Sequence, residues 1–501
     1  MTTSISSPKN SALVSQETEV RLTDARGFTS YRIRHTLASR FAFLIICLAI
    51  ILSALAYGTV HAWSLAMFFI GSIVLLILWV VDCWILNAVR LSKNVLQLPL
   101  LGLLLLGLVQ LLPFRNPDHG GAISLPFVHS LSYSPYATRF IVIEVIALLL
   151  YFGSTLVFLD TPKRLRLLVR TITIFGFILA IFGLTQSFTS PTRVMWIREM
   201  PQSEAFGPFI NRHHFAGYME LTIALPLGLV FSNAVEREKK FIYLFAAGLM
   251  AVALVMTNSR GGIISLVAEL LFLISLMGIR RHRRKERTQK TARLKSAAMR
   301  AGLALALIIG LFVAVVMLGG EQALSRLVGT VNADDPTTGR AQFWSVTVDI
   351  IKNHPVIGTG LGSFAVVYTG YDTRNGLYRL EQAHNDYLQV LSDGGIVGAA
   401  IGLVFLIALF RMGFTRRESR DDFRRGVATG ALAGCFAVLV HSFFDFTLHT
   451  TSNSLLFLVL AALATMNGRV EEVHSRRKKK KKEASQTAAA PAEFTQPAAA
   501  T

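Results

Sequence analysis

The chain has 501 residues, a formal net charge of +20 and a mean hydropathy of +0.51. Hydrophobic residues make up 52% of it and charged residues only 16%, so a soluble fold of this size would have too few polar side chains to cover its surface. The composition argues against an ordinary soluble enzyme and predicts an all-α integral membrane protein.

Twelve apolar blocks have roughly the ~20 residues that a helix needs to cross a hydrocarbon core of about 30 Å. The first is longer than a signal-peptide core and has no clear cleavage site, so we expect it to be retained. The three cysteines, Cys47, Cys83 and Cys435, lie inside such blocks, which predicts small apolar side chains rather than a disulfide or zinc site. The predicted spans are residues 41–60, 64–86, 95–112, 139–159, 171–188, 215–232, 241–257, 261–279, 301–319, 395–410, 426–441 and 453–466.

The basic residues are concentrated in alternate connecting segments. With a cytoplasmic N-terminus, 39 of the 50 Lys and Arg residues fall on the cytoplasmic side, and Lys352 is the only lysine on the other side. The opposite orientation would place the basic run at residues 280–285 across the membrane, against the known bias of cytoplasmic loops. We therefore expect both termini to be cytoplasmic. This placement also accounts for the net charge without a nucleic-acid partner.

Three regions follow from this pattern. Residues 1–40 form a polar cytoplasmic segment, and residues 41–466 form the polytopic membrane domain. Residues 467–501 are first basic and then rich in Ala, Pro and Thr, so they cannot form a core and are expected to be disordered. Their basic run is expected to contact anionic lipid headgroups, with a specific protein partner as the alternative.

The longest external segment is residues 320–394, between the ninth and tenth spans. Within it, Phe343, Val346, Ile350 and Ile351 recur at helical spacing, which predicts an amphipathic helix over 340–353. We expect a catalytic loop of short helices that lies on the outer membrane face.

Charged groups near apolar spans are costly and are therefore candidates for function. Arg260 lies between the seventh and eighth spans, beside two glycines, and its guanidinium can bind phosphate oxygens with a planar fork. The alternative is an arginine that extends to lipid headgroups. Arg340 and His384 bracket the last part of the long external loop, and a neutral imidazole can take a proton from a sugar hydroxyl.

A second polar cluster lies at the outer end of the sixth span. His213 and His214 are neighbours in sequence and so do not converge on one metal ion, and no carboxylate or cysteine lies at ligand spacing. We interpret Asn211 and His214 as part of the wall of a polar site and Arg212 as a further anion contact.

Other motifs add less. His441, Asp445 and His449 near the eleventh span could form a similar constellation, although packing or hydrogen bonding is the favoured interpretation. The sequence has no nucleotide-binding glycine loop, no His-Glu-x-x-His motif and no Gly-x-Ser-x-Gly motif. We therefore expect no metal, no cofactor and no use of ATP, and an activated donor already in the membrane fits better.

The long external loop resembles the signature loop of the bacterial O-antigen ligase and polymerase superfamily. The upstream turn around Arg260 and the segment from Asn211 look like further family elements, so that the resemblance runs from Asn211 to Gly398. The motifs that carry it are Gly339-Arg340 with Trp344, Pro355-x-x-Gly358-x-Gly360-x-Gly362, His384-Asn385-x-x-Leu388 and Gly394-Gly395-x-x-Gly398.

The resemblance implies a GT-C-like membrane glycosyltransferase. Such an enzyme would move a glycan from an undecaprenyl-diphosphate-linked donor to a periplasmic acceptor in the bacterial inner membrane, without a metal ion. In this chain, Arg260 and Arg340 match the arginines expected to hold the diphosphate, and His384 matches the histidine expected to activate the acceptor hydroxyl. We expect Asn385 and Trp344 to contribute to substrate binding.

The preferred acceptor is a lipid A-core sugar, as in an O-antigen ligase. A polysaccharide polymerase or a protein O-oligosaccharyltransferase would use the same donor with another acceptor. A secondary transporter or flippase is the alternative from another class, since twelve spans are common there. We find no internal repeat and no pair of broken helices with ionisable residues at the midplane, which argues against transport.

Overall fold

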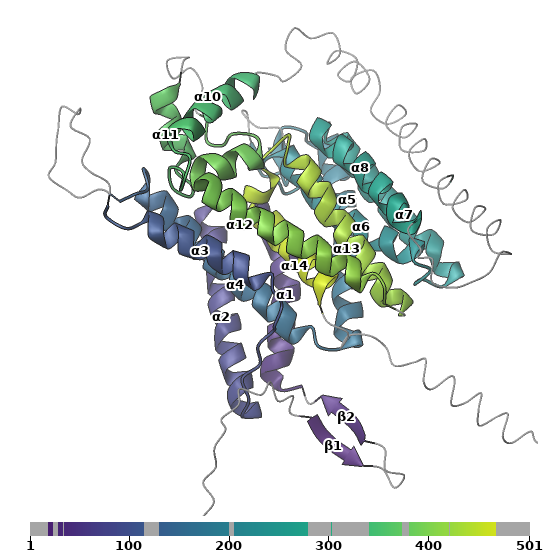
Figure 1. The fold of residues 1–501 in the computed structure, drawn as a ribbon. Helices are drawn as coiled ribbons and strands as arrows, with labels where there is room; N and C mark the ends of the chain where they lie inside the picture. Colours follow the sequence, from purple (N-terminus) through teal and green to yellow (C-terminus); the bar gives the residue numbers. More distant parts are fainter. Residues whose placement is uncertain are drawn as a thin grey trace, which may run out of the picture.

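The computed structural model describes residues 19–23, 29–33, 35–114, 130–199, 205–278, 302, 340–372, 380–419 and 421–466, and most of these residues lie in helices (Figure 1). The longer helices are α1 (Leu37–Leu55), α2 (Ala62–Leu86), α3 (Gln97–Gln110), α4 (Pro135–Phe158), α5 (Pro162–Thr189), α6 (Arg212–Phe231), α7 (Lys240–Met256), α8 (Arg260–Gly278), α10 (Arg340–Asn353), α11 (Phe364–Tyr371), α12 (Asp386–Arg416), α13 (Asp422–His441) and α14 (Thr451–Thr465). Short 3-10 helices are η1 (Tyr57–Thr59), η2 (Arg237–Lys239) and η4 (Thr447–His449).

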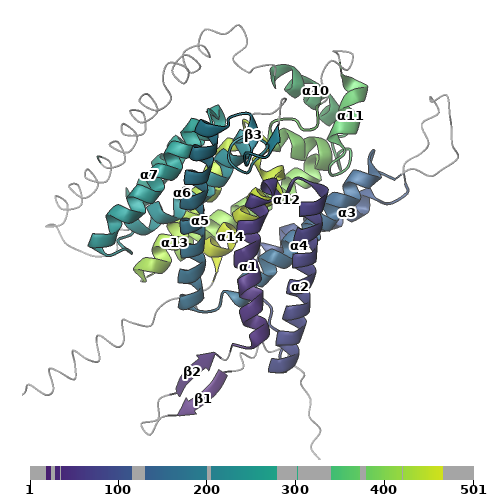
Figure 2. The ribbon, with the colours of Figure 1, turned by 180° about the vertical axis from the view of Figure 1, so that it is seen from behind.

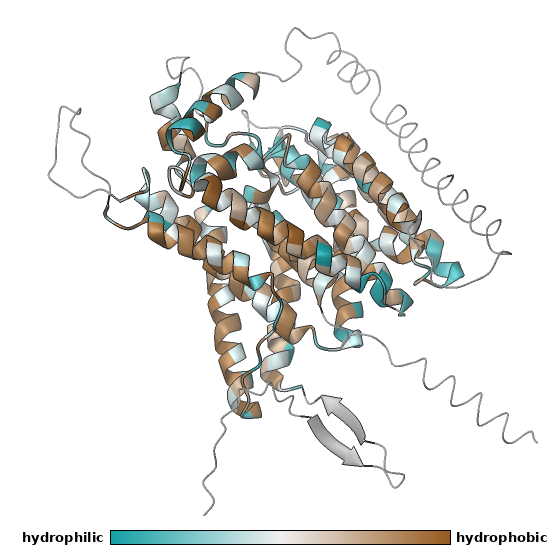
Figure 3. Ribbon diagram, in the orientation of Figure 1, coloured by the Kyte–Doolittle hydropathy of each residue, from teal (hydrophilic) through white to brown (hydrophobic). Residues whose placement is uncertain are grey.

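Within these described residues, eight helices are long and apolar enough to cross a membrane, and α3 and α14 are shorter apolar helices. Figure 3 shows the apolar residues along the lengths of α2, α3 and α12. These findings confirm an all-α membrane protein. The ninth predicted span, 301–319, lies almost entirely outside the described residues, so the number of spans stays a prediction.

Several helices begin earlier than their apolar blocks. Helix α5 starts at Pro162, where the Thr161 hydroxyl accepts a hydrogen bond from the backbone N–H of Arg164, and α12 starts at Asp386. The helices contain the predicted spans 171–188 and 395–410 and extend beyond them, because hydropathy detects the apolar part of a helix and not its polar first turns. The sequence analysis predicted no strands. The structure has two antiparallel pairs, β1 (Glu19–Thr23) with β2 (Thr29–Ile33) and β3 (Arg193–Val194) with β4 (Arg198–Glu199).

Helix α6 lies at the centre of the bundle, and its apolar window is wholly buried. It packs against α13 with unusually close backbones, since a Cβ atom on Gly228 would lie 2.5 Å from the Cα atom of Gly430. Gly426, Gly430 and Gly434 recur every four residues along α13. Such stripes of small residues let membrane helices approach closely, because van der Waals packing rather than hydrophobic burial holds helices together in lipid.

We expect Gly228→Ala to destabilise the protein by about 1–3 kcal/mol, because the added methyl group forces α6 and α13 apart. Gly248→Ala on α7 is the matched control, since a Cβ atom there meets nothing within 4 Å. Thermal melts of detergent-solubilised protein measure the difference. Equal melting temperatures for the two variants would contradict the importance of this contact.

Helix α12 is broken at Gly395, whose φ of 61° and ψ of −162° are not helical. The turn-rich segment before α11 fills the break: Ile396 and Val397 donate their backbone N–H groups to the carbonyls of Pro355 and Val356 at 2.8 and 3.1 Å. The interrupted helix therefore keeps its backbone hydrogen-bonded through this segment. Consequently the first turns of α12, which follow His384, have a fixed direction.

The two ends of the bundle differ in character. At one end, which we call the Asp160 end, Arg90 bridges the carboxylates of Asp82 and Asp160 at 3.0 and 2.8 Å, and Arg164 contacts Asp160 at 3.2 Å. At the opposite end lie α10 and α11, together with the start of α12 (Figure 1). From behind, β3 is seen near this same end (Figure 2). We call it the His384 end.

Candidate active site

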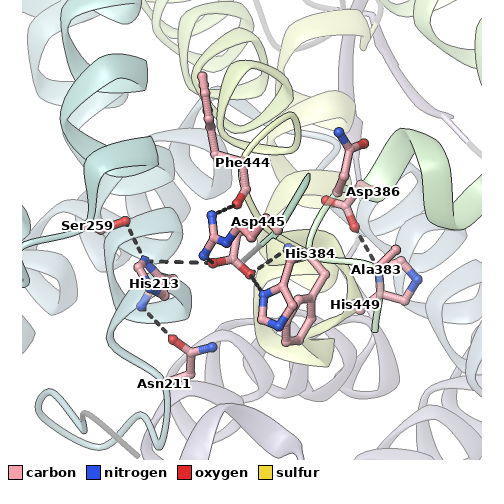
Figure 4. A network of polar contacts seen from close by, with 12 residues as sticks. Asn211, His213, Ser259, Ala383, His384, Asp386, Phe444, Asp445 and His449 are labelled. Atoms are coloured by element: carbon pink, nitrogen blue, oxygen red, sulfur yellow. Dashed lines mark hydrogen bonds and ion pairs between the residues drawn. The ribbon is translucent and has the colours of Figure 1, made fainter. Parts of the chain in front are cut away.

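Asp445, in the segment between α13 and α14, is the centre of a polar cluster at the His384 end (Figure 4). Its Oδ2 atom lies 3.2 Å from Nη2 of Arg340 and 3.7 Å from Nδ1 of His213, and its Oδ1 atom lies 3.3 Å from Nδ1 of His384. The Asp445 side chain is only 1% exposed, whereas those of His213, Arg340 and His384 are 20–28% exposed. A buried carboxylate thus organises three nitrogen-bearing side chains that can reach a ligand.

Asp445 is held in its ionised form. Burial alone would raise the pKa of its carboxyl, but the hydrogen bond from His384 and the electrostatic attraction of His213, His384 and Arg340 hold that pKa well below its usual range. The carboxylate therefore remains negative and accepts hydrogen bonds throughout the physiological pH range.

His384 is fixed by the polypeptide that follows it. Its φ of 50° turns the chain immediately before α12, and Asn385 caps that helix by accepting hydrogen bonds from the backbone N–H groups of Tyr387 and Leu388 at 3.0 and 3.1 Å. The Asn385 amide also donates to the carbonyl of Phe443 at 3.0 Å. The start of α12 is therefore tied to the segment that carries Asp445.

Arg340, the first residue of α10, spans two acceptors. Its Nη1 donates to the carbonyl of Phe444 and its Nη2 to Asp445. Trp344, one turn later, donates its indole N–H to the carbonyl of Ala383 at 3.2 Å. Helix α10, predicted as an amphipathic helix over 340–353, is confirmed with these bounds, and its first turns contact both parts of the cluster.

A second histidine–carboxylate pair lies beside the first. Nδ1 of His449 lies 2.7 Å from Oδ1 of Asp386, whose other oxygen accepts a hydrogen bond from the Ser442 hydroxyl at 2.7 Å. Burial favours the neutral imidazole, but the hydrogen bond to Asp386 and the negative charges of Asp386, Asp393 and Glu144 outweigh it and raise the pKa of His449. The two pairs join the same two segments of the chain, because His384 contacts Asp445 and Asp386 contacts His449.

This pair gives a prediction for the pH dependence of stability. Because the folded pKa of His449 lies above its unfolded value of about 6.5, the stabilisation is complete below that pH and is lost as the pH rises through the folded value. We expect His449→Gln to cost about 1.5–3 kcal/mol near pH 6 and less in alkali. Melts of solubilised protein across this range test it.

Ser442→Ala is the matched control, because it removes a hydrogen bond to the same Asp386 carboxylate but no titratable group. Its effect on melting should not change with pH across that interval. A destabilisation by His449→Gln that is the same in acid and alkali would show that the pair is not charged.

The other predicted site residues have diverse surroundings. Arg260 is exposed at the start of α8, and its neighbours Ser259 and Gly261 border the cluster: Ser259 contacts His213, and a Cβ atom on Gly261 would lie 2.7 Å from the ring of His441. Arg212 is partly buried at the start of α6.

Two predicted wall residues have contacts that support the fold. Asn211 caps α6 by accepting the backbone N–H of His213 at 2.8 Å. His214 is buried, and its ring packs edge-on against Phe446 with centroids 4.9 Å apart. The ring of His384 contacts Phe446 at the same centroid distance. Asn211 therefore fixes the start of α6, and His214 packs against the same Phe446 ring as His384. The part of these two residues in substrate binding stays a prediction.

Sequence reasoning underestimated Asp445 and left His213 out of the site. Asp445 was interpreted as a packing or hydrogen-bonding residue, yet it contacts Arg340 and His384, which lie 105 and 61 positions away in the chain. The available signal was an acidic residue between Phe444 and Phe446, where an unpaired charge would be costly. For His213, the signal was its position between Arg212 and His214.

One comparison with known proteins gives a match. Residues 245–403 match the family model described as O-Antigen ligase. The matched stretch runs from α7 to the first half of α12, and so includes Arg260, Arg340 and His384, whereas His213 and Asp445 lie outside it. The comparison with curated proteins finds no match to this chain.

Proposed function

We propose that the chain is a glycosyltransferase that transfers a glycan from an undecaprenyl-diphosphate-linked donor to a lipid A-core sugar, because residues 245–403 match the O-antigen ligase family model. The family implies a glycan-transferring enzyme of the ligase type, with a lipid-linked donor and a glycan acceptor in general. The identity of carrier and acceptor is our proposal. The observation that carries it is the contact of both Arg340 and His384 with Asp445.

His384 is proposed as the general base. Its Nδ1 faces the Asp445 carboxylate, which favours a proton on that nitrogen and leaves the lone pair on Nε2. In the part of the chain that the structure describes, no hydrogen bond to Nε2 of His384 is formed, and the side chain is 28% exposed. This nitrogen can therefore accept the proton of an acceptor hydroxyl.

The reaction is balanced by simple bond exchange. The acceptor oxygen forms a bond to the anomeric carbon of the glycan as its proton passes to Nε2 of His384. The bond between that carbon and the diphosphate oxygen breaks, and undecaprenyl diphosphate leaves with the electron pair. No oxidant, nucleotide or metal ion is required for this exchange.

Arg340 is proposed to stabilise the leaving group. Negative charge gathers on the diphosphate as the glycosidic bond breaks, so a fixed guanidinium lowers the energy of the transition state more than that of the bound donor. Arg340 is held on one side by Phe444 and Asp445, and its remaining N–H groups can meet phosphate oxygens. Arg260, exposed one residue from Ser259, is proposed as the second clamp.

The proposed orientation places the His384 end in the periplasm and both termini in the cytoplasm of a bacterial inner-membrane protein. The distribution of Lys and Arg along the sequence supports this, because the segments expected on the cytoplasmic side carry 39 of the 50 basic residues. The basic tail after residue 466 lies outside the described residues, and its proposed contact with anionic lipids rests on sequence alone.

The test reconstitutes the full-length protein in liposomes with an undecaprenyl-diphosphate-linked glycan and a panel of acceptors. We expect transfer to lipid A-core that needs no nucleotide. Transfer only to a second donor glycan would instead identify a polymerase, and transfer only to a protein would identify an O-oligosaccharyltransferase. Movement of the donor between leaflets without any covalent transfer would refute the enzyme and favour a flippase.

A further inference from the structure

A chain of polar contacts runs from the bundle interior to the cluster at Asp445. Glu220 on α6 contacts Nδ1 of His441 at 2.8 Å, and Nε2 of His441 lies 3.4 Å from the hydroxyl of Ser259. The same hydroxyl lies 2.8 Å from Nδ1 of His213. Glu220, Ser259 and His441 are completely buried, and ionisable groups are rarely retained inside a membrane bundle without a function.

The hydrogen-bond directions in this chain determine where His213 carries its proton. Ser259 accepts a hydrogen bond from the backbone N–H of Gly262 at 3.1 Å, and its hydroxyl lies nearer to Nδ1 of His213, at 2.8 Å, than to Nε2 of His441, at 3.4 Å. The hydroxyl has a single proton, and the shorter contact places it toward His213. The 2.8 Å contact has the length usual for a hydroxyl donor.

An imidazole that accepts a hydrogen bond at Nδ1 carries its proton on Nε2 when it is neutral. Nδ1 of His213 lies 2.8 Å from the Ser259 hydroxyl, whereas the Asp445 carboxylate, at 3.7 Å from the same nitrogen, is beyond hydrogen-bonding distance. The His213 side chain is 20% exposed. Within the described residues, Nε2 of His213 makes no hydrogen bond to the protein. The buried chain thus orients an N–H donor toward the ligand side of the cluster.

We propose that His213 donates this Nε2 proton in a hydrogen bond to a diphosphate oxygen of the lipid-linked donor, and that Ser259 is the positioning residue that holds it in the donating form. The inference rests on the proposed function. Arg212 and Arg340 are close enough to His213 to interact with it electrostatically, so their positive charges would offset the Asp445 carboxylate, 3.7 Å from His213, when an anion binds there. The positive end of the α6 dipole adds to this field.

The experiment measures the Kd of the full-length, detergent-solubilised protein for undecaprenyl diphosphate that carries no glycan, so that catalysis is not needed. In His213→Asn the amide nitrogen can reach only the Nδ1 position, whereas in His213→Gln it can reach the Nε2 position. We expect His213→Asn to weaken binding roughly 10- to 100-fold, as for loss of a hydrogen bond to a charged group. His213→Gln should recover most of that loss.

Two further variants test the chain and the specificity. Ser259→Ala should weaken binding by less than His213→Asn, and its effect should largely disappear in the double variant, because both act through one ring. Lys352→Gln removes an exposed cation that pairs with Asp349 on α10 and should leave the Kd unchanged. Melting curves for each variant confirm that it is folded.

The outcomes separate the inference from the function on which it rests. Tight binding of undecaprenyl diphosphate by the wild type, with the same Kd for His213→Asn, would overturn only the role of His213. Stronger binding by His213→Asn than by His213→Gln would assign the opposite tautomer and also overturn it. A wild type that does not bind undecaprenyl diphosphate would overturn both the inference and the proposed function.

Discussion

Replacing His384 with alanine is expected to lower kcat for glycan transfer by roughly 100- to 10,000-fold, the usual contribution of a positioned general base. The donor should still bind, because His384 is proposed to act on the acceptor hydroxyl and not on the diphosphate. Steady-state kinetics in proteoliposomes, with donor and acceptor varied separately, distinguish an effect on kcat from one on KM. His384→Gln should be nearly as inactive, since an amide cannot take up the proton.

The matched control is His61→Ala. His61 precedes α2, and its ring lies 2.9 Å from the guanidinium of Arg198. The variant therefore removes a histidine–arginine contact that does not involve Asp445. It should retain the wild-type kcat. Asp445→Asn gives an intermediate test, because it leaves the imidazole in place but removes the carboxylate that sets its tautomer, and should cost about 10- to 100-fold. Full activity in His384→Ala would refute the proposed base.

Arg340→Ala should lower kcat by about 100- to 1,000-fold, comparable to the loss of one preorganised donor from a site that stabilises developing negative charge. Arg340→Lys keeps the charge but loses the planar fork that reaches both Phe444 and Asp445, so it should recover only part of the activity. The same kinetic assay, together with the Kd for undecaprenyl diphosphate, measures both effects.

Arg193→Ala is the control for this series, because its ion pair with Glu199 is exposed and makes no contact with Asp445. Exposed pairs of this kind contribute little, so activity and melting temperature should stay unchanged. If Arg340→Ala retained wild-type kcat and melted normally, the electrostatic part of the proposed mechanism would be incorrect.

The membrane architecture was largely predictable because the length of an apolar block is a direct physical requirement of the bilayer. The starts of α5 and α12 were not, since their first turns are polar and are capped by Thr161 and Asn385. The break in α12 was also beyond hydropathy. Its glycine was visible, but the segment that fills the break comes from a different part of the chain.

The candidate site shows a similar division. Arg340 and His384 could be identified because they lie in local motifs of the unusually long segment between the ninth and tenth predicted spans. Their common partner could not, because only folding brings Asp445 to them across two more helices. The hydrogen-bond chain through Ser259 was hidden for the same reason, since it joins α6, α8 and α13. Sequence patterns reveal reactive groups more readily than the side chains that orient them.

The contact between His384 and Asp445 has a consequence for biogenesis. The two residues are 61 positions apart, and α12 and α13 lie between them. A nascent chain therefore exposes the imidazole before its carboxylate partner has left the ribosome. The site can mature only when α13 has entered the bilayer and the segment beyond it has returned to the start of α12. Premature termination within α13 would thus give an inserted but catalytically silent protein.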